Sequence, residues 1–138
     1  MDTGFIFQQF FDDLSAHLRN GAFESVILCF KLPATLRFGL SHMQVSTYSM
    51  LIEHFQSCRV NLAGLNEMIN VYHVQPNGKR RWIVDLEWVF TNSEGVEVQR
   101  SHQKVHITST KRGSLKIRQM HVLEMWPETP MASLPLMT

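Results

Sequence analysis

Cysteine is scarce in this sequence, and no long apolar run is present. The two cysteines among the 138 residues, Cys29 and Cys58, stand far apart, which excludes a closely spaced redox pair and a zinc cluster. We expect both to be buried as small apolar side chains. No apolar stretch approaches the roughly 20 residues that a membrane span needs, and no basic residue precedes the first apolar run. These absences predict a cytoplasmic protein of bacterial type with no membrane partner.

An excess of charge of either sign is also missing. Thirteen lysines and arginines stand against twelve acidic residues, so the formal net charge is only +1. Nucleic-acid-binding domains are usually strongly basic, so no nucleic-acid partner is expected, and basic residues 79–81 are interpreted as a solvated loop tip. The sequence contains no nucleophile elbow, phosphate loop or dinucleotide fingerprint. We therefore expect no cofactor.

A metal site is likewise not predicted. His102 and His106 have a spacing at which a strand can present two ligands, but no third ligand accompanies them. Lys104 lies between the two histidines, and Arg100 and Arg118 are expected nearby, so the local field disfavours a cation. We interpret these residues as polar side chains at an interface.

The sequence does contain three helical patterns near its amino terminus. Apolar residues recur at three- and four-residue steps over residues 5–18 and again over 23–30, where Pro33 prevents continuation. Residues 34–38 favour a short strand. Ser46 is expected to cap a third helix that closes at Gly64.

From Asn66 onward the period falls to two, and β-branched and aromatic residues predict four strands. The Asn77-Gly78 pair favours a tight hairpin, while residues 92–95 and 110–113 favour a type I turn followed by a glycine bulge. Such turns join antiparallel neighbours. The length fits one domain, which we place at residues 1–126, followed by a proline-containing tail at 127–138. The predicted class is α+β, with three helices packed on a strongly curved, mostly antiparallel sheet around an apolar pocket.

Counting from the two glycine-bulge turns predicts the faces of the last three strands. One face carries Trp82 and Trp88. On the other, Asp85, Gln103 and His121 fall in one row with apolar neighbours. Asp85 and His121 are the candidate catalytic residues, because burial raises the pKa of a carboxyl group and histidine titrates near neutrality.

Gln103 would orient either catalytic group or a ligand carbonyl. Alternatively, the three side chains only satisfy one another as buried polar groups. Five other residues are predicted to line the pocket: Glu87, Tyr72, Tyr48, Phe11 and Phe55.

Both predicted faces are too apolar for either to be plain solvent surface. The helices can cover one face, so we expect a second copy of the chain to cover the other in a two-fold homodimer. Tryptophan and arginine are enriched at the centres of such contacts. The predicted interface residues are Trp82, Trp88, Arg100, His102 and Glu124.

The order helix, helix, short strand, helix and four-strand meander resembles the nuclear transport factor 2-like superfamily, which includes SnoaL-like and ketosteroid-isomerase-like proteins. Local resemblance lies in the run from Trp88 to the glycine turn at Gly95, and in residues 115–117. Many small members have tryptophan-arginine-isoleucine at the latter place, where this chain has Leu-Lys-Ile. The resemblance covers roughly residues 5–126. It implies a cystatin-like cone in which helices and a bent sheet enclose a cavity, often in a homodimer.

The resemblance does not supply a catalytic motif. Isomerases of the superfamily place a tyrosine in the first helix, where this chain has Phe7, Phe10 and Phe11. Its dehydratases use a histidine near an aspartate deep in the cone, and only Asp85 and His121 offer such a pair here.

The favoured function is therefore a small-ligand pocket protein of the SnoaL-like type. It would bind a mostly apolar molecule and, if Asp85 and His121 meet, catalyse an isomerisation, dehydration or cyclisation. The alternative is a non-catalytic dimeric interaction or scaffold domain with a filled cone. A cavity of several hundred Å³ that reaches Asp85 favours the first function, and a filled cone favours the second. The sequence does not decide whether the protein is an enzyme.

Overall fold

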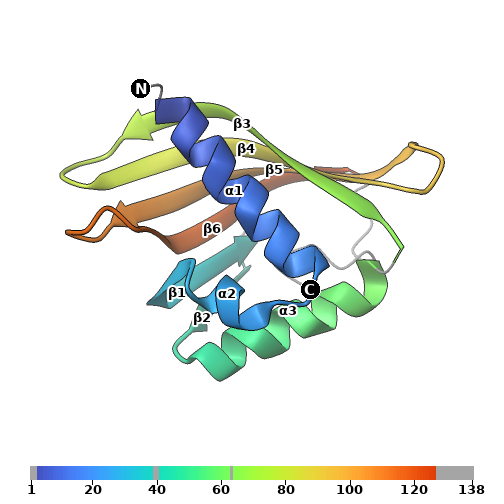
Figure 1. Cartoon of the computed structure of the whole chain (residues 1–138), viewed down its shortest axis with the longest axis horizontal. Coiled ribbons are helices and arrows are strands. Elements are labelled where there is room, and N and C mark those ends of the chain that lie inside the picture. The colour runs from blue at the N-terminus through green and yellow to red at the C-terminus, as the bar shows by residue number, and fades with distance from the viewer. Residues whose placement is uncertain (1–2, 39–40, 63, 127–138) are drawn as a thin grey trace.

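The computed structural model describes residues 3–38, 41–62 and 64–126, and in these residues it contains three helices and six strands (Figure 1). The helices are α1 (Thr3–Arg19), α2 (Phe23–Ile27) and α3 (Tyr48–Leu62). The strands are β1 (Phe30–Phe38), β2 (Ser41–Val45), β3 (Asn66–Pro76), β4 (Arg81–Thr91), β5 (Glu97–Ser109) and β6 (Leu115–Trp126). The predicted α+β class is confirmed, and the predicted tail at 127–138 lies outside the described residues.

Helix α1 lies across one face of the sheet (Figure 1). Phe7, Phe11 and Leu14 of its apolar stripe are at most 2% exposed, as the helical period predicts. Gln8 joins the helix to β3, because its Nε2 donates to the Ile69 carbonyl at 2.6 Å and its Oε1 accepts from the Val71 amide at 2.8 Å. The helix is thus held over the strand by polar contacts as well as by apolar burial.

Helix α3 begins later than the sequence predicts. The Thr47 hydroxyl, not that of Ser46, accepts a hydrogen bond from the Met50 amide at 3.2 Å, which is the contact that an N-cap residue makes. Leu51 and Phe55 on its inner side are fully buried. None of the helices in the described part of the chain is long and apolar enough to cross a membrane.

The strand order in the sheet is β2-β1-β6-β5-β4-β3. All neighbouring pairs are antiparallel except β1 and β6, which run parallel. The sequence predicted the four long strands and residues 34–38 of β1. It did not predict β2, and the second helical pattern extends over Phe30, where β1 begins.

Both predicted glycine-bulge turns form. The Gly95 amide donates to the Asn92 carbonyl at 3.0 Å, the Gly113 amide donates to the Thr110 carbonyl at 2.9 Å, and both glycines have positive φ. The Asn77-Gly78 connection differs from the predicted tight hairpin. It is a longer loop that closes with the Asn77 amide donating to the Arg81 carbonyl at 2.9 Å.

Additional bulges inside the strands change the predicted register. Phe90 pairs with Gln99 and Thr91 with Glu97, so Val98 is an extra residue in β5. Further shifts in the pairing of β5 with β6 leave Arg118 and Leu123 as extra residues. Because side chains alternate along a strand, a shift of one residue moves each side chain to the opposite face relative to its predicted neighbours.

Candidate functional site

The sheet has an inner face, which the helices cover, and an outer face, which they do not. Trp88 pairs with Ser101, and Leu86 pairs with Gln103, so the β4 tryptophan and the β5 glutamine share the inner face. Trp88 is 0% exposed. The prediction that Trp88 and Gln103 lie on opposite faces of the sheet is therefore wrong.

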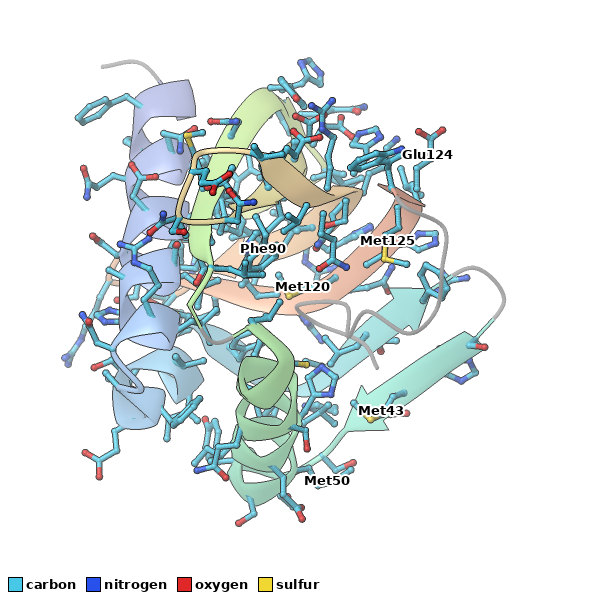
Figure 2. The ribbon with its side chains drawn as sticks, turned by 90° about the vertical axis from the view of Figure 1, so that its right-hand side faces the viewer. Met43, Met50, Phe90, Met120, Glu124 and Met125 are labelled. Carbon is cyan, nitrogen blue, oxygen red and sulfur yellow. The ribbon has the colours of Figure 1, made fainter. Side chains whose placement is uncertain are left out.

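The inner face encloses an apolar interior. Leu36, Phe90, Met120 and Val122 are at most 1% exposed. Figure 2 shows Phe90 and Met120 between the helices and the sheet. Phe11 and Phe55, which the sequence predicted to line the pocket, are also fully buried on this side.

Three buried amide and hydroxyl side chains follow the inner side of β5. They are Gln99, Ser101 and Gln103, with exposures of 3%, 1% and 0%. Gln103 Nε2 donates to Ser101 Oγ at 2.9 Å, and Gln99 Nε2 lies 3.3 Å from Met125 Sδ. Gln103 Oε1 has no hydrogen-bond partner among the described residues. This set thus presents a free acceptor in apolar surroundings.

A carboxylate belongs to the same interior. Glu67 of β3 is 8% exposed, and its Oε2 accepts a hydrogen bond from Trp88 Nε1 at 2.8 Å. This bond fixes the indole ring, which stacks on Phe90 with ring centroids 6.3 Å apart. Tryptophan N–H groups usually find such a partner when they are buried.

The sequence prediction did not include Glu67, Gln99 or Ser101 among the candidate site residues. Glu67 alternates with Ile69 at the start of β3, and that alternation was the signal that could have placed it inside. Gln99 and Ser101 alternate with Gln103 along β5, so the same signal placed them on the face of Gln103.

The predicted row of Asp85, Gln103 and His121 does not form. Asp85 pairs with Lys104, and Lys104 pairs with His121, so the residue between the two candidates is a lysine on the outer face. The pairing of β5 is shifted by one residue against β4 and by one residue against β6. Asp85 and His121 therefore stay in a common row, but Lys104 takes the place of Gln103 between them. Strands two positions apart in a sheet are separated by about 10 Å, which is too far for direct proton exchange between the two side chains.

Each of the two candidates has other neighbours. Asp85 Oδ1 lies 3.7 Å from His102 Nε2. The pKa of His121 is lowered by burial and by the positive charges of Arg37 and Lys104. The acid–base pair proposed from the sequence is therefore not supported by this geometry.

A hollow of about 910 Å³ lies at one end of the outer face and reaches Glu87 and His102 but not Asp85. It is lined by Phe38, Glu87, Glu97, Arg100, His102, Leu123, Glu124, Met125 and Trp126. Arg100 binds Glu97 at 2.6 Å and Glu87 at 3.6 Å, so these charges largely satisfy one another. The hollow therefore combines charged side chains with the apolar side chains of Phe38, Leu123, Met125 and Trp126, unlike the mostly apolar interior.

The tyrosines predicted for the pocket are on the surface. Tyr48 is 49% exposed and Tyr72 is 59% exposed. Tyr72 donates a hydrogen bond to Glu87, which raises the pKa of the tyrosine. Tyr72 and Glu87 therefore belong to the charged outer face and not to the interior.

The predicted interface residues divide between the two faces. Trp88 is fully buried on the inner face, and the ring of Trp82 packs edge-on against Phe7 of α1 at 5.4 Å. Arg100, His102 and Glu124 lie on the outer face, where they line the hollow. A tryptophan-centred interface through Trp88 is thus excluded, because helix α1 and the core cover that side.

The expected burial of the cysteines is complete for Cys58 and only partial for Cys29. Cys58 is 0% exposed, and burial of Cys29 raises the pKa of its thiol to about 11. A thiol with that pKa is overwhelmingly protonated at neutral pH, so it is a poor nucleophile.

The geometry defines an α+β cone with a polar set of side chains on its buried sheet face. No protein-family model matches the chain, and no curated protein matches it. Among solved structures, a cystatin-like protein of unknown function from Nostoc punctiforme PCC 73102 has a TM-score of 0.72 at 14% identity, over 90% of this chain and 91% of that one. A nuclear transport factor 2-like protein of unknown function from Shewanella oneidensis MR-1 has a TM-score of 0.66 at 7% identity, over 83% and 93%.

A third similar structure is a Catenulispora acidiphila protein in complex with S-DNPA. Its TM-score is 0.63 at 11% identity, over 84% of this chain and 90% of that one. The chain therefore has the cystatin-like fold of nuclear transport factor 2-like proteins, as its sequence resemblance implied. At these identities the likeness concerns the fold and not the activity.

Proposed function

We propose that this protein binds a small, mostly apolar molecule in the interior of the cone, with Gln103 as the polar anchor. The observation that carries the proposal is the amide oxygen of Gln103, which is fully buried and has no hydrogen-bond partner among the described residues. A ligand hydroxyl or N–H group would supply the missing donor.

The energetic argument concerns the free protein. A buried polar atom without a partner destabilises the folded state by about 1–3 kcal/mol. An apolar side chain of similar size would avoid that cost, so a glutamine at this place suggests selection for something other than stability. Polar groups that converge in an apolar pocket commonly orient a ligand.

The surroundings of Gln103 favour an adaptable pocket. Met120 is a near neighbour of Gln103 on the inner face, since it lies two residues from Val122, which pairs with Gln103, and methionine repacks at low cost because its side chain is unbranched. The similar Catenulispora acidiphila protein, solved with S-DNPA, supports the view that this fold accommodates small molecules. Ligand entry would require Met120 and its neighbours to move, since they are at most 1% exposed.

The proposal is tested with a matched pair of probes, 1-naphthol and naphthalene, which differ by one hydroxyl donor. Binding is followed through the methyl NMR signals of the methionines and by calorimetry. We expect 1-naphthol to bind about tenfold more tightly than naphthalene, as one hydrogen bond to a buried acceptor allows, and to shift Met120. Gln103→Met should abolish that difference and stabilise the free protein by about 1 kcal/mol. Gln119→Met on the outer face is the control and should change neither quantity.

The alternative function is a non-catalytic interaction domain, and one observation favours it. Leu36, Met120 and Val122 are 0% exposed, so side chains fill the interior around Gln103. If Gln103→Met stabilises the protein while neither probe shifts Met120, ligand binding in the cone is rejected and this alternative is preferred.

A further inference from the structure

A second hollow, of about 400 Å³, lies on the outer face where β1, β2, β4, β5 and β6 all contribute residues. Four of its residues form one row across neighbouring strands: Gln44, Thr35, Gln119 and His106. Every one of these side chains can donate a hydrogen bond. The floor of the hollow is therefore a line of uncharged or weakly basic polar side chains, each with a hydrogen-bond donor available.

Two arginines complete the hollow. Arg118 is the extra residue at a bulge in β6, and Arg81 begins β4. Among the described residues that line the hollow, none is acidic. The structure gives neither arginine a carboxylate partner within the described part of the chain, whereas Arg100 at the other end of this face binds two glutamates.

The adjacent row adds positive charge. Arg37, His121 and Lys104 are consecutive partners across β1, β6 and β5, and the row continues to Asp85 of β4 and His73 of β3. Asp85 is the one carboxylate in this row, and it lies 3.7 Å from His102 on the side away from the hollow.

The pKa of His106 is affected by burial and by the positive charges around the hollow. Burial lowers its pKa, and the charges of His121, Arg37 and Lys104 lower it further. The positive charges of Arg37 and Lys104 thus act on His106 at the floor of the hollow.

One wall of the hollow is the loop that joins β3 to β4, and hydrogen bonds hold this loop in place without a ligand. The carbonyl oxygen of Arg80 accepts from the Ser109 amide at 2.9 Å and from the Thr108 hydroxyl at 3.3 Å. The loop is thereby attached to β5, next to Arg81 and Asn77. Pre-formed sites bind more tightly because less freedom is lost on binding.

From this arrangement we propose a second binding site, on the opposite face of the sheet from the cone, that takes the phosphate group of a small molecule. Arginine forks match phosphate oxygens in pairs, and neutral amide and hydroxyl donors occupy the remaining oxygens. The volume exceeds that of one phosphate ion and lies within the lower part of the range of small-molecule sites. The bound group is therefore part of a larger molecule.

The proposal is tested by titrating the full chain with inorganic phosphate and with glycerol phosphate, against sodium chloride at equal ionic strength. The ring signals of His106 are followed by NMR. We expect saturable shifts with both phosphates, tighter binding of glycerol phosphate, and no saturable shift with chloride. Since hydrogen bonds to a charged group are strong, Arg118→Ala and Arg81→Ala should each weaken binding about tenfold or more.

Arg112→Ala, at the exposed tip of the loop between β5 and β6, is the matched control and should bind phosphate as the wild type does. Arg118→Lys keeps the charge without the fork and should lose part of the affinity, so a folding defect in the alanine variant does not obscure the result. Equal binding by the Arg118, Arg81 and Arg112 variants would overturn the proposal. It would also fail if a second copy of the chain fills the hollow, seen as a doubled mass by light scattering together with no phosphate shift of His106.

Discussion

Gln103 and Lys104 are adjacent in β5 and lie in opposite environments. Gln103 is 0% exposed in the interior, whereas Lys104 is exposed on the outer face between Asp85 and His121. A slip of one residue in the strand register would exchange them and would bury an ammonium group among apolar side chains. The cost of burying an unpaired charge makes the observed register the stable one.

The histidines beside Lys104 give the stability of the protein a pH dependence. Burial and nearby cations lower the pKa of His106 and of His121 below the ordinary value of 6.5. Below that value the unfolded chain binds more protons than the folded one, so the free energy of unfolding should fall as the pH drops from about 7 towards 5. Urea unfolding in phosphate-free buffer measures this slope.

Two variants separate the causes of this slope. His106→Asn combined with His121→Asn should flatten it. Arg37→Gln should flatten it less, because burial is the largest cause of both shifts and the charge of Arg37 is a smaller one. A double variant with the slope of the wild type would show that other groups determine the pH dependence.

At the scale of elements, the bulge at Val98 decides which side chains of β5 face the interior. The Asn92 turn alone would pair Phe90 with Val98, but the extra residue pairs Phe90 with Gln99. Val98 itself is 36% exposed, so the presence of an extra residue at this point sets the strand pairing, and the identity of its side chain matters less.

Deleting Val98 should therefore be far more harmful than substituting it. The deletion forces β5 either to turn its buried residues outward or to lose its turn, and we expect a loss of more than about 4 kcal/mol of folding free energy or no folding at all. Val98→Ala keeps the residue count and should cost less than about 1 kcal/mol. Near-ultraviolet circular dichroism and urea unfolding provide the measurement. A deletion variant as stable as Val98→Ala would contradict this role of the bulge.

The sequence predicts elements whose signals are local. The stripe of α1 and the glycine turns at Gly95 and Gly113 formed as expected, because helical periodicity and positive φ at glycine depend on a few neighbouring residues. The interior site was only partly predictable. Gln103 is buried, as predicted, but the bulges at Val98 and Arg118 contain no glycine and arise from pairing with distant strands. Strand β2 was not predicted because its five residues carry no strong local signal, and they form a strand through their pairing with β1.

At the scale of the whole molecule, the outer face has two unlike ends. One end carries the arginine-lined hollow, and the other carries a row of Met68, Val89, Arg100 and Trp126. Met68 and Trp126, at the two ends of this row, are 55% and 57% exposed, which is high for large apolar side chains. We propose that the homodimer expected from the sequence pairs through this second end, with two-fold symmetry placing the row of each chain against that of its copy.

Light scattering coupled to size exclusion tests the dimer. We expect the wild type to have twice the chain mass of 16.0 kDa. Trp126→Glu should weaken association about tenfold or more, as loss of a central aromatic residue does, whereas Lys111→Glu at a loop tip should not. A wild type that elutes at the mass of one chain over the micromolar range would reject the dimer.

The parallel pairing of β1 with β6 has a consequence for synthesis of the chain. Strand β1 belongs to the first third of the sequence, and its partner β6 is the last described strand. On the ribosome, β1 and β2 emerge early and must wait for almost the whole chain before the sheet joins them to β5. During that interval β1 has an unpaired edge, which chaperones or neighbouring nascent chains can reach. Because this contact spans so much of the sequence, its closure is the step at which folding should be slowest.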